Sequence, residues 1–176
     1  MATGRPNACN QCHLDRSLGW AANHLATWYG SARPELSEEE ERTAASVLWL
    51  LRGDAGQRAL MAWSLGWDEA RAASGSEWMA PYLAELLDDP YEAVRFIARR
   101  SLRRLPGFQA FDYDIVGPRE ERIAARQRAL SLWEERQSAG GGPSGEAILV
   151  DSGRLRRGEV QRLLRKRDDR RMALHE

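Results

Sequence analysis

The chain has 176 residues, with 26 basic and 26 acidic side chains and a formal net charge of zero. This length suits one domain with a small appendage, and a composition of 43% hydrophobic and 30% charged residues is that of a globular chain with a real core. Zero net charge argues against a generic nucleic-acid or membrane-surface binder, and no apolar run approaches the roughly 20 residues that a transmembrane helix needs.

Both cysteines of the chain lie in one five-residue C-x-x-C-H motif, formed by Cys9, Cys12 and His13. Two thiols three residues apart can bond to the two vinyl groups on one edge of a porphyrin, and the residue that follows can turn its imidazole toward the iron. The motif therefore predicts covalently bound haem c, with Cys9 and Cys12 as thioether links and His13 as the proximal iron ligand.

Three alternatives compete with haem at this motif. A redox dithiol also uses C-x-x-C, but it is expected within a thioredoxin-like βαβ unit. A zinc site would combine the two thiolates with His13 and would need a fourth ligand. The third alternative is a surface thiol pair, free or disulfide-bonded, that holds no cofactor.

The sequence offers several residue types for the sixth iron ligand. The further histidines and the thioether candidates are His24, His175, Met61, Met79 and Met172. Because His24 follows His13 on the same predicted helix, one rigid helix cannot readily place both imidazoles on opposite faces of one ring. We therefore expect an open or externally supplied sixth position, with His24 as a candidate ligand of a second or neighbouring haem.

The motif leads into a predicted helix that Asp15 caps and that ends before Gly30. Its apolar residues recur at helical spacing from Leu18 onward. Trp20 and Trp28 could wall a porphyrin or face the core of a helical domain. The pattern favours core packing for Trp28 and leaves both interpretations open for Trp20.

Further helices follow with clear start and stop signals. The predicted ranges are 37–53, 54–66, 68–73, 77–87 and 89–105. Ser37 with Glu40, and Asp54 with Gln57, have the spacing of capping boxes, whereas Asp89 and Pro90 restart the chain after a stop.

Residues 81–105 resemble a HEAT repeat, in which Leu-Leu-Asp-Asp-Pro joins two helices and the second reads V-R-x-x-A-x-x-x-L. The likeness is weaker over residues 46–66. It implies that helix pairs stack into a short solenoid, because one pair cannot bury its apolar stripe alone. Within it, Arg95 is expected to reach an acidic turn residue, Asp88 or Asp89.

The rest of the chain predicts an extended segment over 108–117, a helix from Pro118 through Trp133, a glycine-rich linker at 140–145, a strand at 147–150 and a basic helix at 154–167. We therefore expect an all-α protein with a small strand-and-helix tail. Its divisions are a haem-attachment segment at 1–30, a HEAT-like repeat domain at 31–138, and a linker with a basic tail at 139–176.

The motif, the Trp-Tyr-Gly helix end at 28–30 and the HEAT-like helices together resemble the C-terminal part of bacterial multihaem cytochrome c proteins with HEAT or tetratricopeptide repeats. The resemblance implies an iron-binding electron-transfer module. It also implies a redox partner or an upstream haem domain, and a periplasmic or other extracytoplasmic location as part of a longer exported chain. Here there is one C-x-x-C-H and no visible leader, so we expect a C-terminal fragment.

Two other functions stay open at this stage. One is a haem-free HEAT-repeat scaffold that binds another protein through its helical surface. The other is an enzyme that reduces a small nitrogen or oxygen compound at an open iron position. Neither a hydrolytic site nor a phosphate loop is evident, because residues 140–145 lack the lysine that a P-loop needs.

Overall fold

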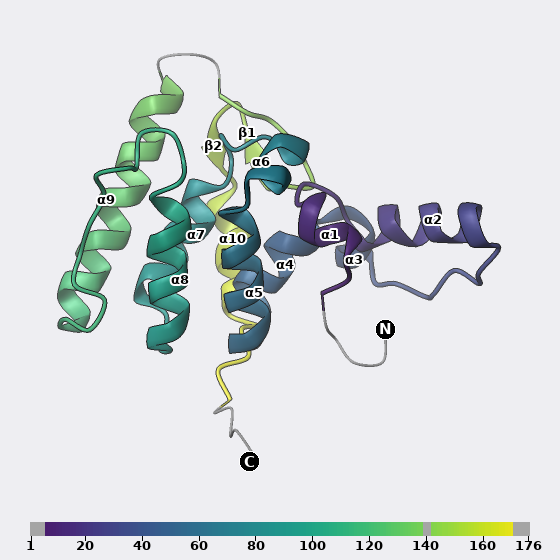
Figure 1. Ribbon diagram of the computed structural model, residues 1–176, viewed down its shortest axis with the longest axis horizontal. Coiled ribbons are helices and arrows are strands. Elements are labelled where there is room, and N and C mark those ends of the chain that lie inside the picture. Colours follow the sequence, from purple (N-terminus) through teal and green to yellow (C-terminus); the bar gives the residue numbers. More distant parts are fainter. Residues whose placement is uncertain (1–5, 139–141, 171–176) are drawn as a thin grey trace.

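The computed structural model describes residues 6–138 and 142–170, and over these residues the chain is mostly helical with a small hairpin near its C-terminus (Figure 1). In chain order the elements are α1 (Cys9–Cys12), α2 (Leu18–Tyr29), α3 (Glu38–Arg42), α4 (Ala45–Arg52), α5 (Ala55–Leu65), α6 (Asp68–Ser74), α7 (Ala80–Glu85), the 3-10 turn η1 (Leu86–Asp88), α8 (Glu92–Leu102), α9 (Arg119–Ser138), β1 (Val150–Asp151), β2 (Arg154–Leu155) and α10 (Arg157–Leu164). Within this described part, no helix is long and apolar enough to cross a membrane.

The body is built from helices that contact their neighbours across short turns. α4 and α5 are joined by Gly53 and Asp54, and Asp54 forms the predicted capping box with Gln57. α5 packs on α8, while α7 packs on α8 and α9, so that α5 and α8 lie side by side (Figure 1). The predicted helices at 54–66 and 68–73 are confirmed as α5 and α6.

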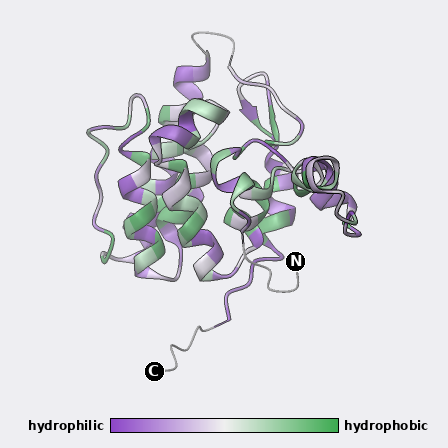
Figure 2. Ribbon diagram, turned by 45° about the vertical axis from the view of Figure 1, so that its right-hand side comes forward, coloured by the Kyte–Doolittle hydropathy of each residue, from purple (hydrophilic) through white to green (hydrophobic). Residues whose placement is uncertain are grey.

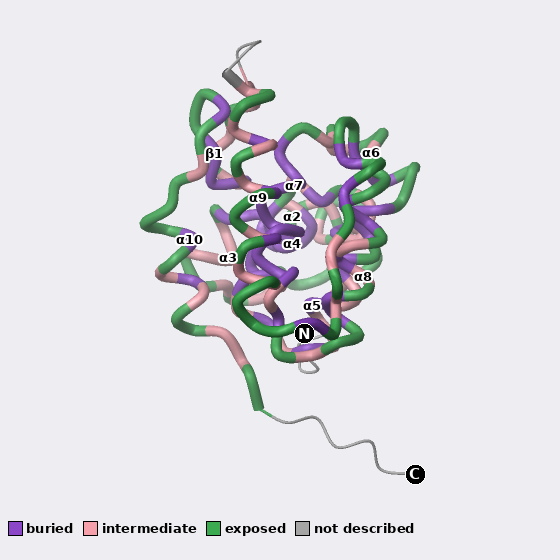
Figure 3. The backbone as a smooth tube through the Cα atoms, turned by 90° about the vertical axis from the view of Figure 1, so that its left-hand side faces the viewer, coloured by how far each residue is buried: buried purple, intermediate pink, exposed green. Residues whose placement is uncertain are grey.

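One hydrophobic core holds these helices together, and Figure 3 shows the buried backbone gathered in the middle of the body. Leu51, Met61, Leu83 and Trp133 each expose at most 2% of their surface. Full burial of an aliphatic side chain of this size stabilises a fold by roughly 1.5–3 kcal/mol. The N-terminal segment packs on this core through Leu14, which belongs to the same buried cluster.

The single helix predicted over 37–53 is in fact two. The backbone is extended at Thr43 and Ala44, between α3 and α4. There Ala44 pairs with Ser17 in an isolated β-bridge, and its N–H donates to the carbonyl oxygen of Ala147 at 2.8 Å. Because tertiary hydrogen bonds cause this break and no glycine or proline marks it, the sequence pattern could not show it.

The turn between α7 and α8 also differs from the prediction. α8 begins at Glu92, and Asp89 accepts a hydrogen bond from the N–H of Tyr91 at 2.9 Å instead of capping a helix that starts at Pro90. Arg95 donates to the carbonyl oxygen of Asp89 at 2.7 Å and to that of Ile115 at 2.6 Å, not to a carboxylate. Arg95 thus holds the loop over 108–117 against the start of α8.

The C-terminal segment from 142 to 170 folds back onto the helices. The predicted strand at 147–150 is displaced, because the hairpin pairs Val150 with Leu155 and Asp151 with Arg154. The Tyr82 hydroxyl donates to the carbonyl oxygen of Ile148. Of the predicted linker, residues 140 and 141 lie outside the described residues, and the predicted domain boundaries stay predictions.

Candidate functional site

The C-x-x-C-H motif forms one turn of helix, α1, followed directly by its C-cap. A spacing of three residues places the Cys9 and Cys12 side chains on the same side of that turn. Both thiols are free and half-buried. The His13 side chain belongs to an exposed residue. The backbone N–H of His13 donates to the Cys9 carbonyl oxygen at 2.9 Å. Two free thiols and one exposed imidazole therefore share one short segment.

The segment is fixed from inside by Asn10, the residue after the first cysteine. Asn10 is fully buried. Its Nδ2 donates to the carbonyl oxygens of Arg16 at 2.9 Å and of Ser17 at 3.4 Å, and its Oδ1 accepts from Asn7 Nδ2 at 2.8 Å. Such a satisfied buried amide ties α1 to the start of α2 and defines one conformation of the turn.

Two serines of the helical body hold the residues around His13. Ser74, at the end of α6, donates its hydroxyl to the Cys12 carbonyl oxygen and accepts from the Leu14 N–H, both at 2.8 Å. Ser46, in α4, donates to the Leu14 carbonyl oxygen at 2.5 Å, and the Leu14 side chain is fully buried. The backbone on both sides of His13 is therefore set by helices that lie far away in sequence.

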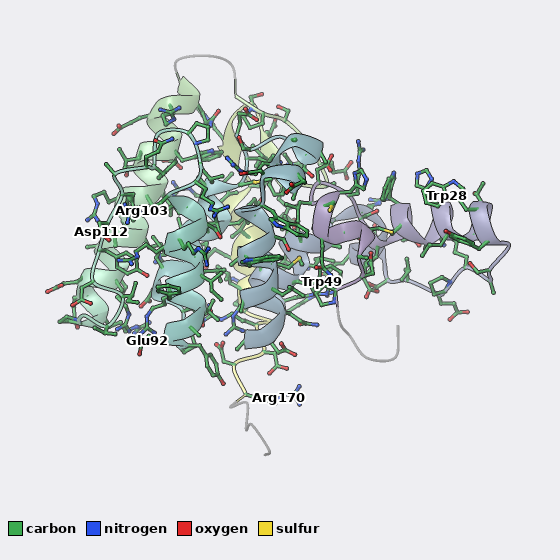
Figure 4. All side chains as sticks on the ribbon, in the orientation of Figure 1. Trp28, Trp49, Glu92, Arg103, Asp112 and Arg170 are labelled. Carbon is green, nitrogen blue, oxygen red and sulfur yellow. The ribbon has the colours of Figure 1, made fainter. Side chains whose placement is uncertain are left out.

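A row of aromatic rings, which we call the aromatic row, runs from the motif along α2. It consists of His13, Trp20, His24 and Trp28, and Figure 4 labels Trp28 on the outer part of α2. The last three are spaced four residues apart, which places them on one helix face. Successive ring centroids are 4.9, 4.5 and 5.0 Å apart. The expectation that Trp28 packs in the core is wrong, because its side chain is 62% exposed.

α2 itself starts two residues later than predicted. Ser17, not Asp15, is the N-cap, and its Oγ accepts from the Trp20 N–H at 3.1 Å. Asp15 pairs with Arg16 at 3.2 Å through Oδ2, and its Oδ1 is buried without a hydrogen-bond partner among the described residues. Gly30 ends the helix in the left-handed conformation, φ 61°, as the sequence predicts.

The outer half of α2 stands out from the body of the molecule (Figures 1 and 2). The helix contains no Asp, Glu, Lys or Arg, although these residues make up 30% of the chain. Arg33 ties the returning loop to it, with Nε donating to Asn23 Oδ1 at 2.7 Å and Nη2 to Glu41 at 2.6 Å. The helix is thus held in place although Trp28 and Tyr29 remain exposed.

Apart from His24, the other ligand candidates are buried in the core or fall outside the described residues. Met61 and Met79 are fully buried in the core, and Met172 and His175 fall outside the described residues. His24 is half-buried between two indole rings. Over residues 6–138 and 142–170, no three His, Cys, Asp or Glu side chains converge to hold a metal ion.

Sequence reasoning placed the thiols and the imidazole but missed Asn10, Ser46 and Ser74. A serine hydroxyl that bridges two chain segments has the same sequence signature as a solvent-exposed one, and only the packing of α4 and α6 reveals the difference. The start of α2 at Ser17 had a signal, since Ser is a preferred N-cap residue.

The comparisons with known proteins add no relative to this picture. No protein-family model matches the chain, and neither the search of curated proteins nor the search of solved structures returned a match. The structure alone shows a small, mostly helical domain that carries an anchored thiol–imidazole segment.

Proposed function

We propose that the chain is a c-type cytochrome module that holds one covalent haem for electron transfer, as part of a larger exported multihaem protein. Cys9 and Cys12 would hold the group through thioether bonds, and His13 would ligate the iron. The observation that carries the proposal is the arrangement of two free thiols on one helical turn with an exposed imidazole directly after it.

The residues present fit this group better than they fit a closed metal site. A structural zinc needs about four converging protein ligands, whereas haem c needs one imidazole and two thiols that bind the porphyrin edge. The described residues bring no such metal cluster together. The aromatic row beside His13 supplies apolar ring surface of the kind that lines a porphyrin site.

The bound group would supply reversible one-electron transfer at its iron. The chain's own part would be to hold the His13 imidazole in one orientation. The hydrogen bonds from Ser46 and Ser74 fix the backbone of Cys12 and Leu14, on either side of His13. The tilted stacking of Trp20 on His13, with ring centroids 4.9 Å apart, limits how the imidazole can turn.

His24 and the partners stay predictions. His24 is half-buried in the aromatic row, and we keep it as a candidate iron ligand of a second or neighbouring haem. The HEAT-like character of the helix pairs, the exported location and the electron-transfer role follow from the resemblance of the motif and helices to multihaem cytochrome c proteins.

The test is to export the chain with a fused leader in cells that express the haem maturation machinery and to record oxidised and reduced absorption spectra. We expect a haem that stays attached through denaturation and shows sharp bands on reduction. Cys9→Ala with Cys12→Ala should abolish the covalent attachment. A wild-type chain that is folded, exported and colourless would overturn the proposal.

The two described histidines give a matched pair of variants. His13→Ala should leave thioether attachment measurable but change the spectrum, because the axial ligand is lost. His24→Ala in the isolated chain should leave attachment and spectrum as in wild type, because the haem that it would ligate belongs elsewhere. Equal spectra for wild type and His13→Ala would rule out the role proposed for His13.

A haem-free scaffold that binds another protein remains the second function. A folded helical chain that takes up no haem under these conditions is its expected outcome, and the same spectra therefore decide between the two. The observation that favours a protein-binding surface lies on α5 and α8, away from the thiols in sequence.

A further inference from the structure

Two neighbouring helices carry the chain's other group of exposed aromatic side chains. Trp63 and Trp67, in and just after α5, expose 39% and 37% of their surface, and their ring centroids lie 4.7 Å apart. Phe96 on α8 is 45% exposed. Arg100 and Arg104 border the two tryptophans in the same shallow hollow. We call these five residues the α5–α8 face.

The hollow itself is too small for a small-molecule ligand. Its volume is about 30 Å³, whereas ligand sites usually measure roughly 300–1,000 Å³. The aromatic rings therefore present a nearly flat surface rather than a pocket. Tryptophan and arginine on such a surface are the residue types that dominate the binding energy of protein–protein interfaces.

The α8 side of the face is positively charged in a chain that is neutral as a whole, whereas Asp68 and Glu69 follow Trp67 on the α5 side. Residues 93–111 contain five arginines and no acidic residue. Arg95 is buried against backbone carbonyls, and Arg99 pairs with Asp112 at 2.8 Å. The acidic residue of α8, Glu92, lies at the opposite end of the helix from Arg103 (Figure 4).

Three exposed arginines remain without a carboxylate partner within the described part of the chain: Arg100, Arg103 and Arg104. Arg103 Nε donates to the Gln109 carbonyl oxygen at 3.2 Å, and Arg104 Nη1 donates to that of Gly66 at 3.2 Å. The second bond holds the Arg104 guanidinium in place beside the two tryptophans. A fixed guanidinium loses less conformational entropy when it pairs with a carboxylate.

We infer that the α5–α8 face docks an acidic segment of a partner protein, whose carboxylates pair with the arginines while an apolar anchor packs on Trp63, Trp67 and Phe96. The positive charge of the arginines favours a partner segment with acidic residues. The exposed aromatic rings favour an apolar side chain between those acidic residues. A nucleic acid fits less well, because its binding relies on many phosphate contacts along a basic groove. The inference is independent of haem at the thiols.

The experiment titrates a labelled synthetic peptide of glutamates around a Phe-Leu pair into the full chain and follows fluorescence anisotropy. We expect saturable binding that weakens as salt rises, because the pairs are partly exposed. Arg100→Glu should weaken binding at least about tenfold, and Trp63→Ala by a similar factor. The matched control is Arg154→Glu, an equal charge change at another exposed site, which should bind as wild type.

Several outcomes would overturn the inference. Peptide binding that is absent at millimolar concentration, or equally weakened by Arg154→Glu, would remove the face as its site. Tighter binding of a single-stranded oligothymidylate that Arg100→Glu abolishes would assign the face to nucleic acid. A concentration-dependent dimer that Arg100→Glu dissociates would assign it to a second copy of the chain. Far-UV circular dichroism of each variant confirms that the fold is retained.

Discussion

Arg58 and Asp89 form a buried ion pair, and neither side chain is exposed to solvent. Arg58 Nε lies 2.7 Å from Asp89 Oδ2, and Nη2 lies 3.2 Å from Oδ1. Arg58 Nη1 also donates to the carbonyl oxygens of Gly53 at 2.6 Å and Asp168 at 2.9 Å. One guanidinium thus joins the α4–α5 turn, the α7–α8 turn and the C-terminal segment.

Asp89→Asn is expected to destabilise the fold by about 3 kcal/mol, because it leaves the buried Arg58 with only Asp169 as a carboxylate partner, 3.3 Å from Nη2 and 45% exposed, while hardly changing the volume. The free energy of unfolding from urea titrations measures the effect. Asp68→Asn is the control, because Asp68 also pairs with an arginine but is 73% exposed, and it should cost less than about 1 kcal/mol. Equal losses for the two variants would contradict the structural role given to the buried pair.

For individual side chains, the sequence identified Asp89 as a partner in an ion pair but not the arginine that pairs with it. Asp89 stood out beside a proline, yet the carboxylate that the sequence offered to Arg95 is taken by Arg58, 31 residues earlier. Arg58 lies in a helix whose polar positions are expected to face solvent. Only the stacking of two helix turns shows that its guanidinium is buried.

Among the elements, the C-terminal end of α2 is fixed by the backbone conformation of Gly30. Gly30 has φ 61°, and an added Cβ would meet no atom within 4 Å, so the backbone conformation alone requires glycine there. Gly158, inside α10, also has open space around it, but its φ is not in the left-handed range. Because neither site is crowded, substitution by alanine at the two glycines compares a strained backbone conformation at Gly30 with an unstrained one at Gly158.

Gly30→Ala should cost about 1–2 kcal/mol and should increase fraying of the last turn of α2, whereas Gly158→Ala should stabilise α10 by about 0.5–1 kcal/mol. Amide hydrogen exchange resolves the two helices. Faster exchange confined to α2 in the first variant and slower exchange in α10 in the second are the expected results. A stabilising Gly30→Ala would contradict the C-cap assignment.

Glu39 joins α3 to α4 and to the C-terminal segment. Hydrogen bonds from Lys166, at 2.7 Å, and from Arg162 lower its pKa to about 2, and Arg52 at 2.6 Å adds to the effect. The ordinary glutamate pKa is 4.5. Since the pKa is lower in the folded chain, the ionised group stabilises the fold above about pH 4.5 and loses this contribution as the pH falls toward 2.

Glu39→Gln should therefore lower the free energy of unfolding by about 1–2 kcal/mol at pH 7, and the difference from wild type should vanish near pH 2. Urea unfolding at several pH values gives this profile. Glu38→Gln is the neighbouring control, because Glu38 is 78% exposed in its pair with Arg42, and it should cost less than about 0.5 kcal/mol. A difference that persists at pH 2 would contradict the lowered pKa.

Element type was predictable wherever capping residues and hydrophobic period agree. The capping boxes at Ser37 and Asp54 and the glycine after α2 are present as expected. Errors fell where long-range contacts decide the backbone, at the break before α4 and in the shift of the hairpin. Local propensity holds no information about the Ala147 carbonyl that accepts a hydrogen bond from Ala44.

On the scale of the whole molecule, the C-terminal segment is part of the fold. Val160 and Leu163 of α10 are buried in the same core as α4, α5 and α7. The basic helix predicted over 154–167 is α10, whose arginine-rich outer side, such as Arg157, is exposed while its apolar side is buried. The apolar residues at helical spacing in 155–164 carried the signal for that packing.

Leu163→Ala is expected to destabilise the chain by about 2–4 kcal/mol, the usual cost of removing a fully buried leucine side chain. Leu25→Ala, on the outer half of α2 and 36% exposed, should change it by less than about 0.5 kcal/mol. Thermal or urea unfolding compares the two. A small effect of Leu163→Ala would show that α10 unfolds apart from the rest.

The candidate site was predictable as a set of residues because its motif is local. Cys9, Cys12 and His13 are contiguous, and their chemistry depends on spacing within one helical turn. The hydrogen bonds that hold this segment were not predictable, because Ser74 lies 62 residues from Cys12 and Ser46 lies 32 residues from Leu14. The same distinction separates Trp63 and Trp67 from Arg100, which meet only after α5 and α8 have packed.

The anchoring of α1 by Ser46 and Ser74 sets an order of events in time. Synthesis proceeds from the N-terminus, so Cys9 and Cys12 emerge from the ribosome well before Ser74, which is 62 residues beyond Cys12. During that interval the thiols belong to an unanchored chain that any modifying enzyme can reach. Once α6 emerges, the same thiols become part of a rigid turn, so the time available for their modification is set by the rate at which the chain is delivered.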